Sequence, residues 1–201
     1  MPRATKEQSE ATATAVRAAA RRLFTERGYA AVPLDEVATE AGVTRGAVYH
    51  HYGSRRGLFA AVHAEVQAGV AAAVDEAAQD AADPWESLER GCRAFLEASV
   101  ADDARRVMLV DGPAVLGWAA WRDVDAASSG RLLDEVLAEL ARAGRLRDVP
   151  VVATSALLSG AMNEAALWIA ASADREAATR DAWDALRDLL RGLRADGTAR
   201  G

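Results

Sequence analysis

The sequence predicts an all-α protein in which a small head of three helices precedes a larger helical bundle, with about nine helices in all. Apolar residues recur at spacings of three and four along most of the 201 residues, and no stretch alternates as a strand would. Alanine, leucine and arginine are abundant and aromatic residues are few, as in other helical proteins. We therefore expect a head at residues 10–70 and a body at residues 71–197.

The first expected helix covers residues 14–27 and ends at Gly28. Its arginines lie away from the apolar positions, so the helix is amphipathic and packs through one face. The positions on that face are Val16, Ala19, Ala20, Leu23 and Phe24.

Residues 33–52 predict two short helices joined by a tight turn. Gly42 follows the first helix and allows positive φ, and Thr44 is a suitable N-cap for the second. Ala38 is small and Val48 is apolar at the positions where the two helices would cross. This spacing is typical of a helix-turn-helix, although an ordinary helical hairpin in a bundle remains an alternative. The outer face of the second helix, which would enter a DNA major groove, carries Thr44, Arg45, Gly46, Tyr49 and His50.

A fourth helix is expected from about residue 55 to residue 80, with Ser54 as its N-cap. Arg55 and Arg56 stand in its first turn, where a positive charge opposes the helix dipole unless an anion lies nearby. A DNA phosphate would supply that anion.

Residues 24–62 resemble the DNA-binding region of the TetR (tetracycline-repressor) family in the glycine-aromatic pair, the alanine-glycine turn, the tyrosine-rich recognition helix and the basic start of helix four. Three departures are Pro33 in place of the usual hydroxyl cap, Tyr52 in place of phenylalanine, and the Arg55-Arg56 pair. Pro33 suits a first helical turn but removes a hydroxyl and an N–H that could hold a phosphate. The resemblance implies DNA contacts by Thr44, Arg45, Gly46, Tyr49, His50 and Arg55, with His51 and Val43 as neighbours of the DNA backbone.

Charge is distributed unevenly between the expected head and the expected body. The net charge is −6, but residues 1–56 carry 9 basic and 6 acidic residues, whereas the rest carries 15 and 24. A basic head and an acidic body favour docking on DNA through the head alone.

Turn and cap signals divide the body. Asp83, Pro84 and Glu86 form a capping-box pattern that opens a fifth helix. We expect a sixth helix from about 102 to 111–113, a seventh from 118 or 123 to 143, an eighth that begins after Pro150, and a ninth that Asp174 caps and that reaches about residue 194. The order and number of helices also agree with the TetR resemblance.

The last two helices are the expected surface of a homodimer, in keeping with the habit of the resembled family, and two heads would then read a palindromic operator. Small groups on the eighth helix and an apolar stripe on the ninth both need partners. The alternative is that these faces simply cover the core of one protomer. The predicted interface consists of Ala156, Ser159, Gly160, Trp183, Leu186, Leu190 and Leu193, and Asn163 shares the small face.

A ligand pocket for a small hydrophobic or aromatic effector is expected between the fifth, seventh and eighth helices. Glu164 is a carboxylate on a face otherwise formed by Leu157, Ala161 and Trp168, and such a group needs a partner. The alternative is a filled core in which Glu164 pairs with Arg105 or Arg106. Part of the body also resembles a C-terminal domain found in actinobacterial TetR-like regulators. The predicted pocket residues are Trp85, Phe95, Met108, Asp111, Trp118, Trp121, Asn163, Glu164 and Trp168.

Other classes of function find little support in the sequence. His50, His51 and His63 form no pattern with Cys92, the only cysteine, that would bind a metal, and neither a G-x-S-x-G elbow nor a phosphate-binding glycine loop is present, so we expect no enzyme, cofactor or metal. Cys92 cannot form an internal disulfide, which agrees with a cytoplasmic location. The apolar tract 151–173 holds Asn163 and Glu164 at its centre and is expected to be a bundle helix rather than a membrane span.

The sequence thus predicts a homodimeric one-component transcriptional regulator, a repressor that a small molecule releases from its operator. The alternatives are the same head with a body that responds to a protein partner or to no ligand, and, last, a helical enzyme.

Overall fold

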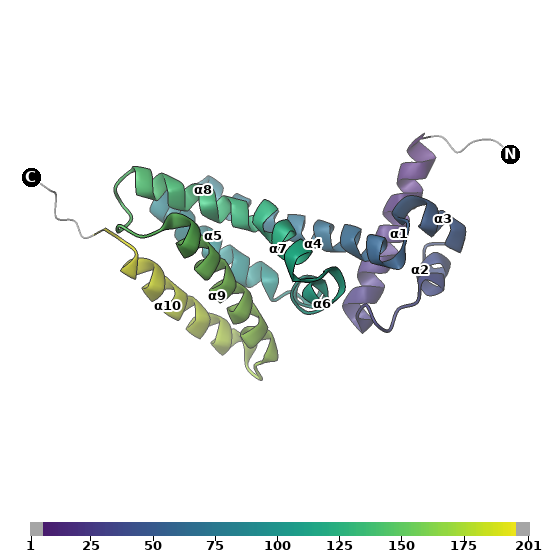
Figure 1. Ribbon diagram of the computed structural model, residues 1–201. Helices are drawn as coiled ribbons and strands as arrows, with labels where there is room; N and C mark the ends of the chain where they lie inside the picture. Colours follow the sequence, from purple (N-terminus) through teal and green to yellow (C-terminus); the bar gives the residue numbers. More distant parts are fainter. Residues whose placement is uncertain (1–5, 196–201) are drawn as a thin grey trace, which may run out of the picture. The chain divides into compact units, whose positions relative to one another are not determined.

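The computed structural model describes residues 6–195 (Figure 1). Within this range the protein consists of ten α-helices and one π-helical segment, with no strand longer than an isolated bridge between Leu146 and Arg194. The all-α class expected from the sequence is confirmed. The chain forms two compact units, which are described in turn: unit 1 holds residues 6–67 and 102–122, and unit 2 holds residues 68–101 and 123–195.

Unit 1 begins with α1 (Lys6–Arg27), α2 (Leu34–Glu40), α3 (Arg45–Tyr52) and the first half of α4 (Arg55–Gln79). Its core is apolar and partly aromatic: the ring of Phe24 lies 5.5 Å from that of Phe59, which in turn lies 5.0 Å from the ring of Tyr29. The helix α1 begins earlier than residue 14, because residues 6–13 are good helix formers that extend the helix without an apolar face.

The turn between α2 and α3 has the features that the sequence predicts. Gly42 has φ +67°, which closes α2, and Val43 N–H donates to the Ala38 carbonyl at 2.9 Å. Thr44 caps α3 by accepting a hydrogen bond from Ala47 N–H at 3.2 Å. Val48 is fully buried. The two helices therefore cross closely, as the small Ala38 and the apolar Val48 indicated.

Pro33 occupies the cap position of α2, where the TetR resemblance placed it. It stands before α2 in extended conformation, with φ −72° and ψ 153°, and its carbonyl accepts hydrogen bonds from Glu36 and Val37. Its side chain provides no hydrogen bond to the helix, as expected from the missing hydroxyl. The acidic Asp35 and Glu36 in the first turn favour this helix end instead through the helix dipole.

Unit 1 also includes a later part of the chain: the π-helical segment η1 (Ala104–Asp111), α6 (Gly112–Leu116) and the start of α7 (Trp118–Ala127). The sequence assigned residues 102–122 to the body. Polar contacts explain their place in unit 1: Asp111 accepts a hydrogen bond from Tyr29 N–H at 2.7 Å, and Arg106 donates to the Arg27 carbonyl at 3.3 Å. The Arg106 guanidinium lies across Gly28, where an added Cβ would clash with it.

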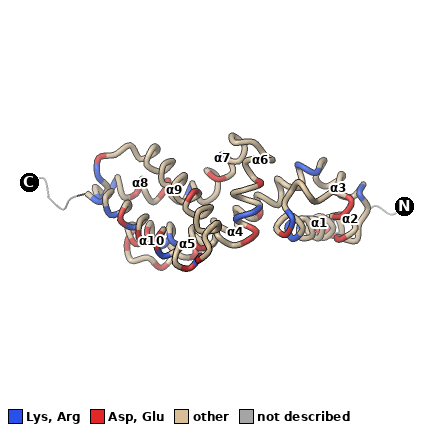
Figure 2. The backbone as a smooth tube through the Cα atoms, turned by 90° about the horizontal axis from the view of Figure 1, so that it is seen from below, with Lys and Arg blue, Asp and Glu red and all other residues tan. Residues whose placement is uncertain are grey.

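Unit 2 is a helical bundle made of the second half of α4, α5 (Pro84–Ser99), the end of α7, α8 (Ser129–Arg142), α9 (Val151–Ala171) and α10 (Arg175–Gly192). Its core includes Leu88, Leu96, Leu137, Ile169 and Leu190, each at most 2% exposed. Acidic and basic residues are interspersed along α10 (Figure 2), where ion pairs join Glu176 to Arg180, Asp184 to Arg187 and Asp188 to Arg191.

The N-caps that the sequence predicts for two helices of unit 2 are confirmed, because each depends only on neighbouring residues. Asp83 accepts hydrogen bonds from Trp85 and Glu86 N–H, and Asp174 accepts one from Ala177 N–H at 3.0 Å. One expectation was wrong: the predicted seventh helix is two helices, because the backbone breaks at Ser128 with ψ −113°. The predicted sixth helix ends at Asp111, as η1 does, but helical backbone continues without a break into α6. Pro113 sits in the first turn of α6, where it needs no N–H donor, and the chain turns only at Gly117.

Among the described helices, α4 alone has the length and apolar composition that could span a bilayer. It carries the fully buried His63 and Gln67 and the ion-paired Glu65, which is the pattern of a core helix. The tract 151–173 that the sequence marked as a bundle helix forms α9.

Candidate nucleic-acid interface and ligand cavity

The outer face of α3 is the exposed surface of the helix-turn-helix. Thr44, Arg45, Gly46 and His50 are exposed, Tyr49 is 42% exposed, and Val48 on the opposite face is fully buried. The Thr44 cap and the close crossing with α2 fix the direction of α3. This face is therefore available to a groove, and its residues are those that the sequence selected.

Arg45 is held in place before any nucleic acid binds. Its guanidinium lies 3.1 Å from an Asp35 carboxylate oxygen, 3.3 Å from the Tyr49 hydroxyl and 5.4 Å from the centre of the Tyr49 ring. The hydrogen bond with Tyr49 and the charge of Asp35 raise the pKa of Arg45, so the side chain stays cationic. Arg45 and Tyr49 thus form a cation-π pair on the exposed face of α3.

The end of α3 is tied to α1. The Tyr52 hydroxyl donates a hydrogen bond to the Ala13 carbonyl at 2.6 Å, and burial raises the pKa of Tyr52. His51 is half-buried beside Tyr52, whereas His50 points to solvent. Tyr52, which stands where the resembled family has phenylalanine, therefore makes a hydrogen bond that phenylalanine could not make.

Arg55 and Arg56 have protein partners. Arg55 donates to the carbonyls of Tyr29 and Ala30, and its guanidinium lies 4.1 Å from the centre of the Tyr29 ring. Arg56 donates to the carbonyls of Val115 and Leu116, at 3.1 and 2.8 Å. The carbonyls at the end of α6 carry partial negative charge. They therefore give Arg56 the negatively charged partner that the sequence analysis expected from a DNA phosphate.

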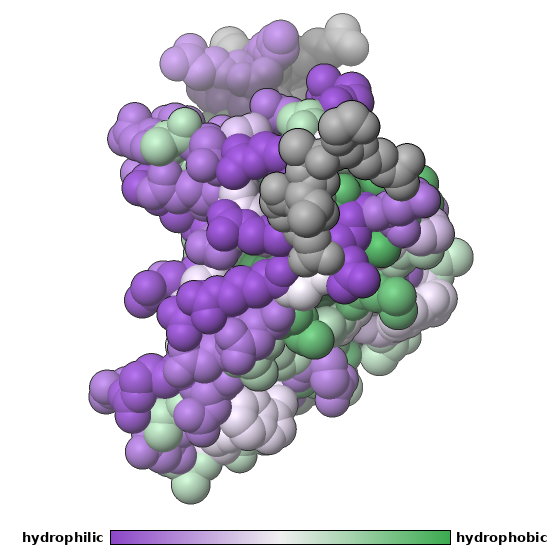
Figure 3. Space-filling model, turned by 90° about the vertical axis from the view of Figure 1, so that its left-hand side faces the viewer, coloured by the Kyte–Doolittle hydropathy of each residue, from purple (hydrophilic) through white to green (hydrophobic). Residues whose placement is uncertain are grey.

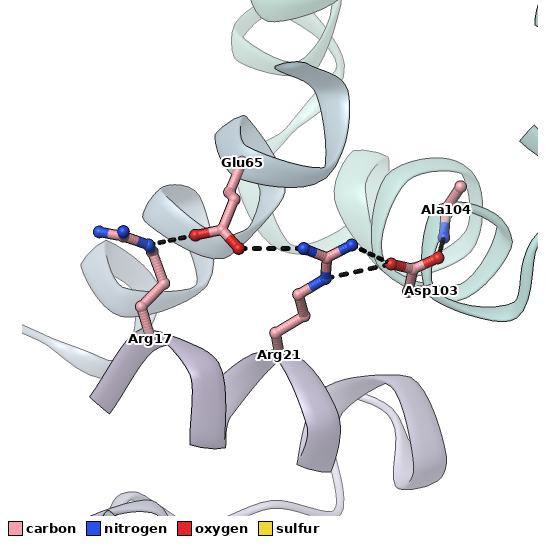
Figure 4. Close-up of polar contacts among 5 residues, drawn as sticks. All are labelled: Arg17, Arg21, Glu65, Asp103 and Ala104. Carbon is pink, nitrogen blue, oxygen red and sulfur yellow. Dashed lines mark hydrogen bonds and ion pairs between the residues drawn. The ribbon is translucent and has the colours of Figure 1, made fainter. Parts of the chain in front are cut away.

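A network of charged groups crosses unit 1 (Figure 4). Glu65 of α4 pairs with Arg17 and Arg21 of α1, the latter at 3.0 Å, and Arg21 pairs with Asp103, which caps η1 through Ala104 N–H. Burial tends to raise the pKa of Glu65 and Asp103, but hydrogen bonds from the arginines outweigh it and lower the pKa of both carboxyls. The network joins α1, α4 and η1.

His63 lies at the centre of the contact between α4 and residues 102–122. It is fully buried, its ring nitrogens make no well-aligned hydrogen bond within the described residues, and a Cβ added at Gly112 would come within 2.9 Å of its Nε2. Burial lowers the pKa of His63 to about 4, and the Met108 backbone offsets this only in part. The imidazole is therefore neutral at physiological pH.

Unit 2 contains a cavity of about 230 Å³ between α4, α5, α8 and α9. Its inner wall is apolar, and Ser87, Gly91, Ser129, Gly130 and Ser159 are small residues that leave room in it. The other lining residues are Val74, Asp75, Ala78, Leu88, Cys92, Phe95, Leu132, Leu133, Glu135, Val136, Glu139 and Met162.

Of the predicted pocket residues, Phe95 lines this cavity and the others lie elsewhere. Met108, Asp111, Trp118 and Trp121 belong to unit 1, where the Trp121 indole donates to the Met108 carbonyl at 2.8 Å. The remaining four lie in unit 2: Trp85 is buried and donates to Glu89, Asn163 is buried, and Glu164 and Trp168 are exposed.

The alternative in which Glu164 pairs inside the protein is wrong, because Glu164 faces solvent and the structure gives both arginines other partners. Arg105 lies 3.9 Å from Asp102, and Arg106 lies 3.6 Å from Asp111. The face of α9 that was interpreted as a pocket wall is exposed to solvent.

The predicted dimer residues divide between surface and core. Ala156 and Gly160 are exposed on α9, Trp183 and Leu193 are half-buried, and Ser159, Leu186 and Leu190 are buried within unit 2. Ser159, Leu186 and Leu190 thus cover the core of unit 2, as the alternative interpretation of these faces stated. Exposed apolar residues occur instead at Val152 and Leu157 of α9 and Leu189 of α10, which are 83%, 75% and 61% exposed. Apolar patches among hydrophilic atoms are visible on the face shown in Figure 3.

The sequence missed the cavity residues of α4 and α8. The signal was present in α8, where Leu133, Val136, Leu137 and Leu140 form an apolar face at spacings of three and four. Periodicity shows which face is inward, but it does not show where the inward faces fail to fill the space. The described residues contain no group of three or more histidine, cysteine, aspartate and glutamate side chains that could hold a metal.

Comparison with known protein families gives two matches. Residues 16–62 match the family described as bacterial regulatory proteins, tetR family, and residues 85–193 match the tetracyclin repressor-like C-terminal domain. Together these matches include the helix-turn-helix and nearly the whole body.

Proteins similar to this chain include named regulators and one regulator with a crystal structure. A crystal structure of a TetR-family transcriptional regulator from Pectobacterium atrosepticum is 35% identical and superposes with a TM-score of 0.81 over 96% of this chain and 99% of that one. The regulator AcrR of Shigella flexneri is 30% identical over 54% of this chain and 51% of its own length, and the repressor BepR of Brucella suis is 33% identical over 53% and 51%. The chain thus spans about half the length of the curated relatives that it matches.

Proposed function

Because the chain belongs to the TetR family of bacterial transcriptional regulators, we propose that it is a homodimeric repressor that reads a palindromic operator through α3 and leaves it when a small molecule enters unit 2. The observation that carries this proposal is the exposed face of α3, where the capped helix presents Arg45, Tyr49 and His50 above a buried Val48. An exposed helix of this kind fits a major groove, and arginine, tyrosine and histidine side chains can form hydrogen bonds with base edges there.

The second copy of the chain supplies the symmetry of the operator. The exposed face of α9, with Leu157 and Trp168, and the exposed Leu189 of α10 form the proposed interface. Ala156 and Gly160 on the same helix allow a partner helix to approach closely. A two-fold pair of heads would place the two α3 helices ~34–36 Å apart, one turn of DNA.

Residues 102–122 are the proposed link between ligand and DNA. They pack in unit 1, but the chain enters them from α5 and leaves them through α7, both of which have residues in unit 2. A ligand that shifts α5 or α8 would pull on this segment, and Asp103, Arg106 and Asp111 would carry the change to α1 and Tyr29. Arg55 then acts as an internal tie to Tyr29 rather than as a mobile DNA contact.

The proposal is tested by selecting binding sites from random double-stranded DNA with the full chain and measuring affinity for the selected site by mobility shift. The expected site is palindromic. Tyr49→Ala should abolish specific binding and leave the dimer intact in analytical ultracentrifugation, because Tyr49 is exposed on α3 and contributes nothing to the core. If this variant binds the selected site with unchanged affinity, α3 is not the helix that recognises the operator.

A further inference from the structure

The charge around the cavity in unit 2 indicates which ligands it accepts. We propose that the effector is a small cationic amphiphile, an amine or ammonium group on an apolar body. This inference rests on the proposed function, in which a ligand enters this cavity. It adds the chemical class of that ligand, which the family matches leave open.

The inner wall of the cavity suits the apolar body. Leu88, Phe95, Leu133 and Met162 are buried side chains in this wall. Cys92 lies beside them, and burial raises the pKa of its thiol to about 12, so it contributes no charge. A ligand that buries an apolar group here removes that surface from water and gains free energy accordingly.

The outer wall of the cavity is acidic. Asp75 of α4 and Glu139 of α8 line it and are exposed, and neither has an ion-pair partner within the described residues. Glu135 also lines the cavity, but it lies 2.6 Å from Arg131, which compensates much of its charge. The lining includes no lysine, arginine or histidine. A concave wall with charge of one sign attracts ligands of the opposite sign.

A buried hydroxyl gives an independent sign of a ligand. Ser129 lines the cavity, is 7% exposed, and its Oγ has no hydrogen-bond partner within the described part of the chain. Leaving a buried hydroxyl unpaired costs free energy, so a polar atom of a bound molecule would relieve that cost. Ser159 differs, because its hydroxyl already donates to Asp125 at 3.0 Å.

Other ligand classes fit less well. An anionic ligand would bring its charge among Asp75, Glu135 and Glu139 without any basic residue in the lining. A neutral apolar ligand would fill the inner wall but make no use of the acidic residues. A cation on an apolar body satisfies both parts of the cavity.

Three probes with the same phenylbutyl body test this inference: 4-phenylbutylamine, 4-phenylbutan-1-ol and 5-phenylpentanoate. Their dissociation constants for the full chain are measured by isothermal titration calorimetry at neutral pH and low salt. The amine should bind roughly threefold to tenfold more tightly than the alcohol, since each exposed ion pair contributes modestly, and the carboxylate should bind most weakly. The preference for the amine should shrink as salt is added.

Matched variants locate the effect. Asp75→Asn combined with Glu139→Gln should make the amine and the alcohol bind equally and leave the alcohol's affinity unchanged. Glu76→Gln combined with Asp134→Asn removes the same charge from exposed positions of the same two helices outside the lining, and should keep the preference. Ala78→Trp, which fills the cavity from α4, should weaken binding of all three probes, with circular dichroism as the check that it folds.

The inference is overturned if the amine does not bind, if the alcohol binds as tightly as the amine, or if the Asp75 and Glu139 double variant keeps the preference. It is also overturned if Ala78→Trp folds and still binds all three probes normally. Addition of each probe to the operator complex separates this inference from the proposed function. Release by amine and alcohol alike contradicts the ligand class alone, whereas preferential binding of the amine without release contradicts the regulatory mechanism alone.

Discussion

Acidification from about pH 7.5 to about pH 5 should cost the protein about 2 kcal/mol of stability through His63 alone. Burial lowers the pKa of folded His63 to about 4, whereas an unfolded histidine titrates near 6.5. Between these values the unfolded chain binds more protons, so the stability is fully present above about pH 6.5 and falls as the pH falls. The complete loss, reached below the folded pKa, is about 3 kcal/mol at about 1.4 kcal/mol per pKa unit.

Urea unfolding followed by tryptophan fluorescence measures this effect at both pH values. His63→Leu keeps a side chain of similar size at the contact with Gly112 but cannot be protonated, so most of the pH dependence in this window should disappear. His50→Gln, on the exposed face of α3, is the matched control and should keep it. The reasoning about burial is refuted if His63→Leu and the wild type lose the same stability between the two pH values. The carboxyls of Glu65 and Asp103 have lowered pKa values, so their contribution is lost only at more acidic pH.

Three further substitutions test the head and the dimer. Thr44→Ala removes the cap of α3 and should lower stability by about 1 kcal/mol, measured by urea unfolding, whereas Thr44→Ser should cost little. Arg55→Ala should destabilise unit 1 without changing the slope of log affinity against log salt in operator binding, because Arg55 is bound to the Tyr29 carbonyl; a slope smaller by about one would restore its phosphate role. Leu157→Glu should turn the dimer into a monomer in analytical ultracentrifugation, whereas Val110→Glu, at an exposed apolar position of unit 1, should not, and a dimeric Leu157→Glu would exclude this face of α9.

The head could be predicted from the sequence because its signals are local. Gly42 must take positive φ, Thr44 must cap α3, and the small Ala38 must face Val48, and each of these requirements falls within a dozen residues. Asp83 and Asp174 were identified as caps for the same reason.

Partners distant in sequence explain what was missed. Residues 102–122 pack in unit 1 through Asp103, Arg106 and Asp111, whose partners Arg21, Arg27 and Tyr29 precede them by about eighty positions. Nothing in the local pattern distinguishes such residues from pocket residues.

The faces of α9 and α10 posed a related difficulty. Leu186 and Leu190 form an apolar stripe that could face either a second protomer or the core, and periodicity is the same in both cases. Burial places them in the core and leaves Leu157 and Leu189 exposed.

Hydroxyl-radical footprinting of the full chain on its selected operator tests the central claim most directly. The account predicts two protected regions related by a two-fold axis, with the centres of their major-groove contacts ~10 base pairs apart, and loss of both with Tyr49→Ala. A single unsymmetrical protected region, or the same footprint with Tyr49→Ala, would contradict the claim that two copies of α3 read the operator.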